Sequence, residues 1–195
     1  MNETKRIYNV ICTILYKIGN RVHDSKGKAI LSNLRNSIGK DISQVPLIWP
    51  IFFENLPEDY METNKFEIEE KIILTVMQLY SIYQQSEDNS LFSSEGMEFC
   101  EALRRIRSID NSEALDRRFN VMITATTYDE ILHHLRQMVK LLKSKSKITE
   151  KINFARLGQD LYKILKFNDK KTMIKWGKQY YYFVNKEEGD VQNDK

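Results

Sequence analysis

The chain has 195 residues, of which 42% are hydrophobic and 29% are charged, so it can form a buried core and disorder of the whole chain is excluded. Seven glycines and three prolines are few for this length, which favours long helices over tight turns. The net charge of +3 is small, but it is distributed unevenly.

The charged residues divide the chain into segments of opposite sign. Residues 1–40 carry a net charge of +6, residues 41–100 carry −10, residues 101–183 carry +9 and residues 184–195 carry −2. This asymmetry indicates a basic working surface beside an acidic remainder. The alternative is that the oppositely charged segments face each other within the fold.

The two cysteines and the N-terminal stretch bear on the cellular compartment. Cys12 and Cys100 belong to no CxxC pair or metal-binding pattern, and we expect them to be buried thiols in a reducing compartment. In the first residues, MNETKRIYNVICTILYK, charged residues interrupt the apolar ones, which is typical of neither a signal peptide nor a membrane span. We therefore expect a soluble, cytoplasmic protein.

Helical spacing dominates the first part of the chain. A helix is predicted over residues 5–22 by the apolar positions Ile7, Val10, Ile11, Ile14 and Ile18. A second helix is predicted to end at Gly39 and to carry Ala29, Ile30, Leu34 and Ile38.

Two prolines, Pro46 and Pro50, restrict the next segment to short helical turns. We expect its apolar residues to be packed: Val45, Leu47, Ile48, Trp49, Ile51, Phe52 and Phe53. The stretch FEIEEKIILTVMQLYSIYQQ, residues 66–85, predicts a central helix whose core face is Ile68, Ile72, Val76, Leu79 and Tyr83. The paired carboxylates Glu69 and Glu70 are expected on its solvated face.

The second half is also predicted to be helical. The polar loop SEDNSLFSS, residues 86–94, divides the chain into subdomains 1–88 and 89–184, followed by a disordered acidic tail, 185–195. Ser94 is expected to cap a helix over residues 95–109. Further helices are predicted at 112–124, 128–143, 154–165 and 171–184. No segment has the period-two alternation of a strand, so we predict an all-α fold, a compact bundle of roughly eight helices.

Motifs for catalysis or for cofactor binding are absent from the sequence. It contains no GxxxxGK[ST], GxGxxG or HExxH. His133 and His134 are adjacent, so on a helix they project about 100° apart and cannot ligate one metal together. We expect no enzymatic activity, no metal and no cofactor.

One predicted helix carries a row of cations beside its row of core residues. Ile131, Leu135, Met138 and Leu142 form the apolar row, and Arg136, Lys140, Lys143 and Lys147 form the basic row. Like charges one helical turn apart cost roughly 0.2–0.5 kcal/mol per pair, and no acid within the row relieves them. A phosphate backbone would neutralise such a row. The alternative is a lysine face that only keeps the protein soluble.

Five arginines lie within fifteen residues of the second half: Arg104, Arg105, Arg107, Arg117 and Arg118. Arginine is the better planar, multi-donor ligand for phosphate. Asp110, Glu113 and Asp116 are close enough in sequence to pair with some of them, which is the structural alternative.

The last predicted helix interleaves aromatic residues with Lys175 and Lys178, as a stacking platform for single strands does. Trp176, Tyr180 and Phe183 have core spacing, and Tyr181 and Tyr182 fit either role.

Six stretches, taken in order, resemble a known family: SKGKAILSNLR, IFFENLP, EFCEALRRI, RRFNVMITATTYDEILHHLRQMVKLLKSK, INFARLGQDLYKI and KWGKQYYYF. They look like the small subunit of the type I-E CRISPR surveillance complex Cascade, the CasB family, over residues 25–183. The expected basic pair after the second helix is here Arg35 followed by Asn36.

The resemblance implies an all-helical, non-enzymatic subunit in antiviral defence. It implies more than one copy per complex, packed head to tail along the filament of backbone subunits that holds the guide RNA. These copies are expected to help hold the guide RNA–target DNA duplex and the displaced DNA strand. Base pairing then reads the sequence while the protein reads backbone charge. The binding positions that carry over are Arg35, Arg104, Arg105, Arg107, Arg117, Arg118 and Arg136.

We add Lys28, Lys140 and Lys143 to this nucleic-acid track from their own charge and place in the basic stretches. The alternative function is a helical adaptor whose basic faces bind an acidic protein partner.

Overall fold

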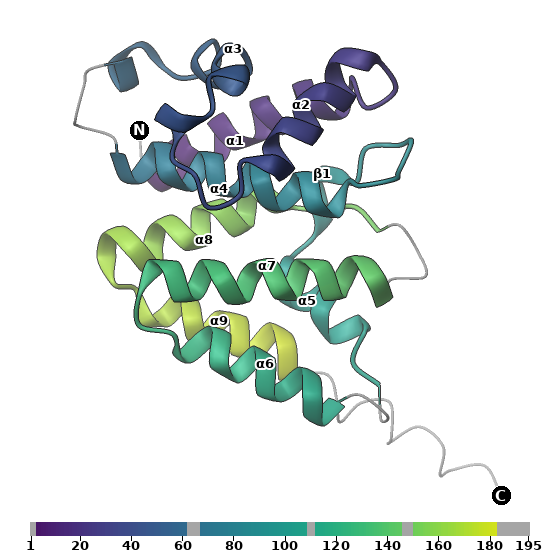
Figure 1. The fold of residues 1–195 in the computed structure, drawn as a ribbon. Helices are drawn as coiled ribbons and strands as arrows, with labels where there is room; N and C mark the ends of the chain where they lie inside the picture. The colour runs from purple at the N-terminus through teal and green to yellow at the C-terminus, as the bar shows by residue number, and fades with distance from the viewer. Residues whose placement is uncertain (1–2, 62–66, 109–111, 146–149, 183–195) are drawn as a thin grey trace, which may run out of the picture.

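The computed structural model describes residues 3–61, 67–108, 112–145 and 150–182 (Figure 1). These residues form nine α-helices, a few short 3₁₀ turns and one short extended segment, so the all-α prediction is confirmed. None of the helices in this described part is long and apolar enough to cross a membrane.

The first two helices are α1, Glu3–Gly19, and α2, Ser25–Asn36. Asp24 caps α2, because its side chain accepts a hydrogen bond from the Gly27 backbone amide at 2.6 Å. Ile38 lies beyond the end of α2, and Gly39 has a left-handed φ of 84° in the turn that follows. Ala29 is exposed and Leu31 takes the buried position, a small correction to the predicted core face.

The proline-containing segment forms short helical turns, as predicted: η1 (Ile42–Gln44), η2 (Pro46–Ile48), α3 (Trp49–Phe53) and η3 (Glu58–Met61). Val45, Ile48 and Phe52 are buried. Leu47 and Trp49 were expected to be packed but are 71% and 41% exposed. Turns this short bury only one side of the chain, so alternate apolar residues face outwards.

Helix α4, Glu67–Tyr83, is the centre of the molecule. It packs against α1, α2, α7 and α8, so Ile72 to Tyr83 are buried on every side rather than along one face. The first turn differs from the prediction, because Ile68 is 38% exposed. Glu69 is buried, not solvated: the Tyr162 hydroxyl donates to it at 2.8 Å and Lys166 Nζ lies 3.3 Å away.

The segment that follows the polar loop is extended, so the predicted helix cap at Ser94 is wrong. β1, Phe92–Met97, pairs with Ile152 through the bonds Met97 N to Lys151 O and Asn153 N to Met97 O, both 2.9 Å. A Cβ on Gly96 would lie 2.6 Å from the Lys151 carbonyl oxygen, so this approach requires glycine. Period-two patterning could not reveal a strand that pairs with a single residue.

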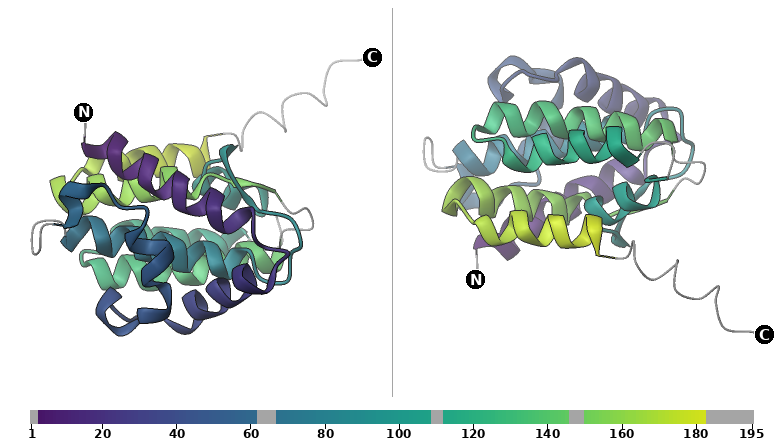
Figure 2. Two further views of the ribbon diagram at one scale, coloured as in Figure 1. Left: turned by 90° about the horizontal axis from the view of Figure 1, so that it is seen from above. Right: turned by 90° about the horizontal axis from the view of Figure 1, so that it is seen from below.

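The remaining helices are α5 (Phe99–Arg105), α6 (Ser112–Thr124), α7 (Tyr128–Lys145), α8 (Phe154–Phe167) and α9 (Lys170–Tyr181). Helix α8 packs against α1 and α4, and a Cβ on Gly158 would lie 2.3 Å from Ile11 Cδ1. Helices α6 and α7 lie side by side, and α9 lies beside α8, as the view from below shows (Figure 2). Cys100 is buried as expected, whereas Cys12 is only half-buried.

Candidate nucleic-acid interface

The three arginines of α5 and its C-terminal turn lie close to carboxylates of the same chain. Arg105 Nη1 lies 2.6 Å from Glu150 Oε1, and Arg104 Nη2 lies 3.7 Å from Glu101 Oε1. Both ion pairs involve at least partly exposed side chains, so each contributes little to stability. These pairs nevertheless reduce the charge that α5 offers to an external phosphate.

Arg107 is held most firmly. Its Nε and Nη2 donate to the two oxygens of Asp116 at 2.8 and 2.7 Å, and the Tyr180 hydroxyl donates to the same carboxylate at 2.8 Å. The hydrogen bond from Arg107 lowers the pKa of Asp116, and it raises the pKa of Arg107. Asp116 was one of the carboxylates expected as possible partners of the arginines, and it does pair with Arg107. This pair joins the end of α5 to α6 and α9.

Arg117 and Arg118 of α6 differ from the α5 group. Both side chains are exposed, and among the described residues neither has a hydrogen bond, an ion pair or an aromatic contact. The core side of α6 is formed by Leu115, Phe119 and Met122, which are buried. Helical geometry therefore directs this arginine pair to the solvent side.

The basic row on α7 is less uniform than its sequence spacing indicated. Lys140 is exposed and no described residue pairs with it. Lys143 forms an ion pair with Glu87, so an acid from the loop after α4 relieves part of the row. Lys143 also lies 5.9 Å from the centre of the Tyr83 ring. Lys147 is outside the described residues.

Arg136 is partly buried at the side of α7 that faces α4, and burial lowers its pKa. Its Nε atom is buried and has no hydrogen-bond partner. It lines a groove of about 710 Å³ between α7, α4 and the start of η1, together with several carboxylates. Arg136 is thus not part of an open basic surface.

The two N-terminal candidates, Lys28 and Arg35, differ in how exposed they are. Lys28 is exposed on α2. Arg35 is half-buried, donates from Nη1 to the Ser81 carbonyl at 3.2 Å, and has its pKa lowered by burial. Arg35 thereby ties α2 to the central helix α4.

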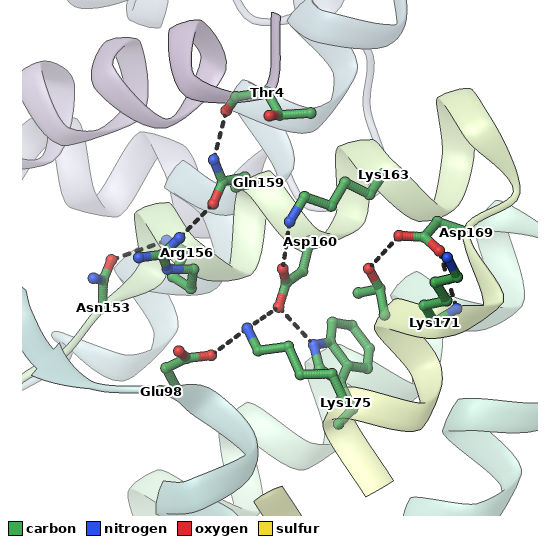
Figure 3. A network of polar contacts seen from close by, with 12 residues as sticks. Thr4, Glu98, Asn153, Arg156, Gln159, Asp160, Lys163, Asp169, Lys171 and Lys175 are labelled. Carbon is green, nitrogen blue, oxygen red and sulfur yellow. Dashed lines mark hydrogen bonds and ion pairs between the residues drawn. The ribbon is translucent and has the colours of Figure 1, made fainter. Parts of the chain in front are cut away.

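The last helix uses its polar residues to hold the core, which the sequence did not indicate. Asp160 is 1% exposed and accepts hydrogen bonds from Trp176 Nε1 at 2.9 Å and from Lys175 Nζ at 3.0 Å (Figure 3). Lys175 also lies 2.6 Å from Glu98. Lys175 is therefore engaged between two carboxylates and is not free to serve a stacking platform. The sequence feature that could have indicated this arrangement is Asp160, an aspartate at a position of α8 where the helical spacing predicts an apolar residue.

The aromatic residues of α9 divide as their spacing suggests. Trp176 and Tyr180 are buried, and Tyr180 stacks on Phe119 at 3.9 Å between ring centres. Phe183 is outside the described residues. Tyr181 and Tyr182 are 38% and 69% exposed, beside Ile174. In the described part of the chain, no cluster of three or more His, Cys, Asp or Glu side chains is suited to a metal.

The comparisons with known proteins agree with this helical architecture. The sequence model of the CRISPR-associated protein Cse2 family matches residues 31–181. The crystal structure of CasB from Thermobifida fusca has 23% sequence identity and a TM-score of 0.73, covering 90% of this chain and 97% of that chain. CasB from M. ruber has 21% identity and a TM-score of 0.58, covering 82% and 88%. No curated protein matches the sequence.

At these identities the two structures establish the fold, and the family match, which spans well over half of the chain, establishes the relationship. The chain belongs to the Cse2 (CasB) family, the small subunits of the type I-E Cascade complex.

Proposed function

We propose that this subunit binds nucleic acid by its backbone within Cascade, and that Arg117 and Arg118 on α6 and Lys140 on α7 are its main phosphate ligands. The observation that carries the proposal is the arginine pair, which is exposed and has no partner among the described residues. Arginines without a carboxylate partner keep their full set of donors for phosphate.

The arrangement of the helices supports a continuous track. Helices α6 and α7 pack against each other and lie side by side in the view from below, so their exposed cations belong to neighbouring elements (Figure 2). Lys28 is a separate exposed cation on α2, which packs mainly against α4 and lies at the opposite end of the molecule from α6 (Figure 1). Arg35, Arg105, Arg107 and Lys143 have a supporting role, because each also joins two segments of the fold, whereas Arg104 pairs with Glu101 within α5.

In the complex, these contacts stabilise the guide RNA–target DNA duplex and the displaced DNA strand without catalysis. Binding through phosphates is independent of base sequence and depends steeply on salt. The partners are the other Cascade subunits, including the backbone subunits, and a second copy of this chain.

Fluorescence anisotropy with a labelled single-stranded DNA, across a salt series, tests the proposal. We expect the logarithm of the binding constant to fall linearly with the logarithm of the salt concentration, with a slope for several phosphates. The same titration is repeated on Cascade reconstituted with and without this subunit. Absence of binding in both settings contradicts the proposal and favours an adaptor whose cations bind an acidic protein.

A further inference from the structure

The groove beside Arg136 is lined by charges of both signs. It lies between the first half of α4, the first half of α7 and the residues that open η1, and its volume is about 710 Å³. Figure 1 shows α7 alongside α4, with the chain after α2 descending in front of α4. Four carboxylates line it: Asp41, Glu67, Glu70 and Asp129. Three cations do so as well: Lys40, Lys71 and Arg136.

Two of these charges are partly buried and have no partner among the described residues. Arg136 has a buried Nε without a hydrogen bond and forms no ion pair with a carboxylate of the described residues, although the nearby Asp129 acts to raise its pKa. Glu70 is half-buried and likewise has no hydrogen bond or ion pair. Burial raises the pKa of Glu70, with Glu67 and Glu69 adding to the effect. A charge removed from water without a partner is costly, so each group gains when an occupant supplies its counter-charge.

The walls of the groove are fixed in place. The Tyr128 hydroxyl hydrogen-bonds to Thr75 on α4, and Lys71 Nζ lies 4.4 Å from the centre of the Tyr128 ring. Thr75 and Gln78 are buried in the floor, and Gln78 donates to the Ser37 carbonyl at 2.8 Å. An occupant therefore meets a preformed surface, which lowers the entropic cost of binding.

We propose that this groove binds an extended protein segment of a neighbouring Cascade subunit other than a second copy of this chain, and that this segment brings a carboxylate to Arg136 and a cation to Glu70. A nucleic-acid strand satisfies Arg136 but leaves Glu70 unpaired, and its phosphates are repelled by four carboxylates. A polypeptide supplies both signs, as well as backbone donors and acceptors.

The test titrates variants of this subunit into Cascade lacking it and measures the dissociation constant for docking. Arg136→Gln and Glu70→Gln are each expected to weaken docking about tenfold, which is less than for a fully buried pair because both side chains are only half-buried. Their melting temperatures stay the same or rise, because an unpaired, partly buried charge has been removed. Lys5→Gln removes an exposed cation of α1 that does not line the groove, so it is the matched control and leaves docking unchanged.

The sign of the Glu70→Gln effect separates the possible occupants. Weaker docking supports a protein segment, because removing a carboxylate can only favour a phosphate. Unchanged or stronger docking of Glu70→Gln overturns the proposal. The proposal is also overturned if Arg136→Gln weakens the binding of free single-stranded DNA as much as Lys140→Gln does. Docking of a second copy of this chain in place of another subunit, detected by cross-linking from a Lys71 or Lys40 position, also overturns it. None of these outcomes decides whether Arg117 and Arg118 bind nucleic acid.

Discussion

The arginines of α5 and those of α6 lie close together in sequence, yet they have different surroundings. Arg105 and Arg107 are bound by Glu150 and Asp116, which come from other segments of the chain. Arg117 and Arg118 have no such partner among the described residues. The difference teaches that local density of arginine is a weak guide to a binding surface. What matters is whether the fold brings a carboxylate to each guanidinium.

The largest effect is expected from removing the exposed pair on α6. The double variant Arg117→Ala, Arg118→Ala should bind single-stranded DNA roughly tenfold or more weakly at moderate salt, because two phosphate ligands are lost. Its melting temperature should remain within about 1 °C of the original, since neither side chain has a partner in the described part of the chain. Anisotropy and thermal unfolding measure the two quantities. A large loss of stability with unchanged DNA binding would place these arginines in the structure instead.

The reverse pattern is expected for Arg107. Arg107→Ala removes a two-bond ion pair and leaves Asp116 with only the Tyr180 hydroxyl, so we expect a loss of about 1–2 kcal/mol and a fall in Tm of about 2–8 °C. DNA binding should change little. Arg105→Ala is the matched control, because its half-exposed ion pair contributes about 0–1 kcal/mol. Strongly weakened DNA binding by Arg107→Ala would show that pairing does not exclude a ligand role.

The Asp116 carboxylate adds a pH dependence to this comparison. Its pKa is lowered in the folded state, chiefly by the hydrogen bond from Arg107, so it stabilises the fold above the ordinary aspartate pKa of 3.8. That contribution is lost as pH falls through the lower folded pKa. The stability difference between the original protein and Asp116→Asn should therefore be full at pH 6 and shrink below about pH 4, as measured by urea unfolding. A difference that is constant across this range would contradict the assignment.

The smallest effects separate two lysines of α7. Lys140→Ala should weaken DNA binding a few-fold and leave stability unchanged, because this side chain is exposed and pairs with no residue that the structure describes. Lys143→Ala should lower stability by less than about 1 kcal/mol through loss of its ion pair with Glu87, with a smaller effect on DNA binding. Equal effects of the two variants on DNA binding would show that the basic row acts as a unit despite Glu87.

Much of the fold could be predicted because hydrophobic spacing reports local structure. The bounds of α6, α7 and α8 follow from their apolar rows, and Trp176 and Tyr180 are buried as their spacing indicates. The extended segment β1 could not be predicted, because it is made by a tertiary approach of Gly96 to residues 151 and 152.

The candidate site could be predicted only in part, for a related reason. Spacing predicts that Arg117 and Arg118 face outwards, and they do. It cannot show that Glu87 reaches Lys143, that Glu150 reaches Arg105, or that Glu69 lies buried against Tyr162, because those partners are far away in sequence.

The division of the chain into two subdomains between residues 88 and 89 stays a prediction, which limited proteolysis would test.

The salt dependence of DNA binding by the original protein and by the Arg117→Ala, Arg118→Ala variant is the most direct test of the account. If this arginine pair binds two phosphates, the slope of the logarithm of the binding constant against the logarithm of the salt concentration should become shallower by about 1.4 for a single strand. The Arg107→Ala variant, measured alongside, should keep the original slope. An unchanged slope for the α6 variant, or an equal loss of slope for Arg107→Ala, would contradict the claim that unpaired arginines form the nucleic-acid surface.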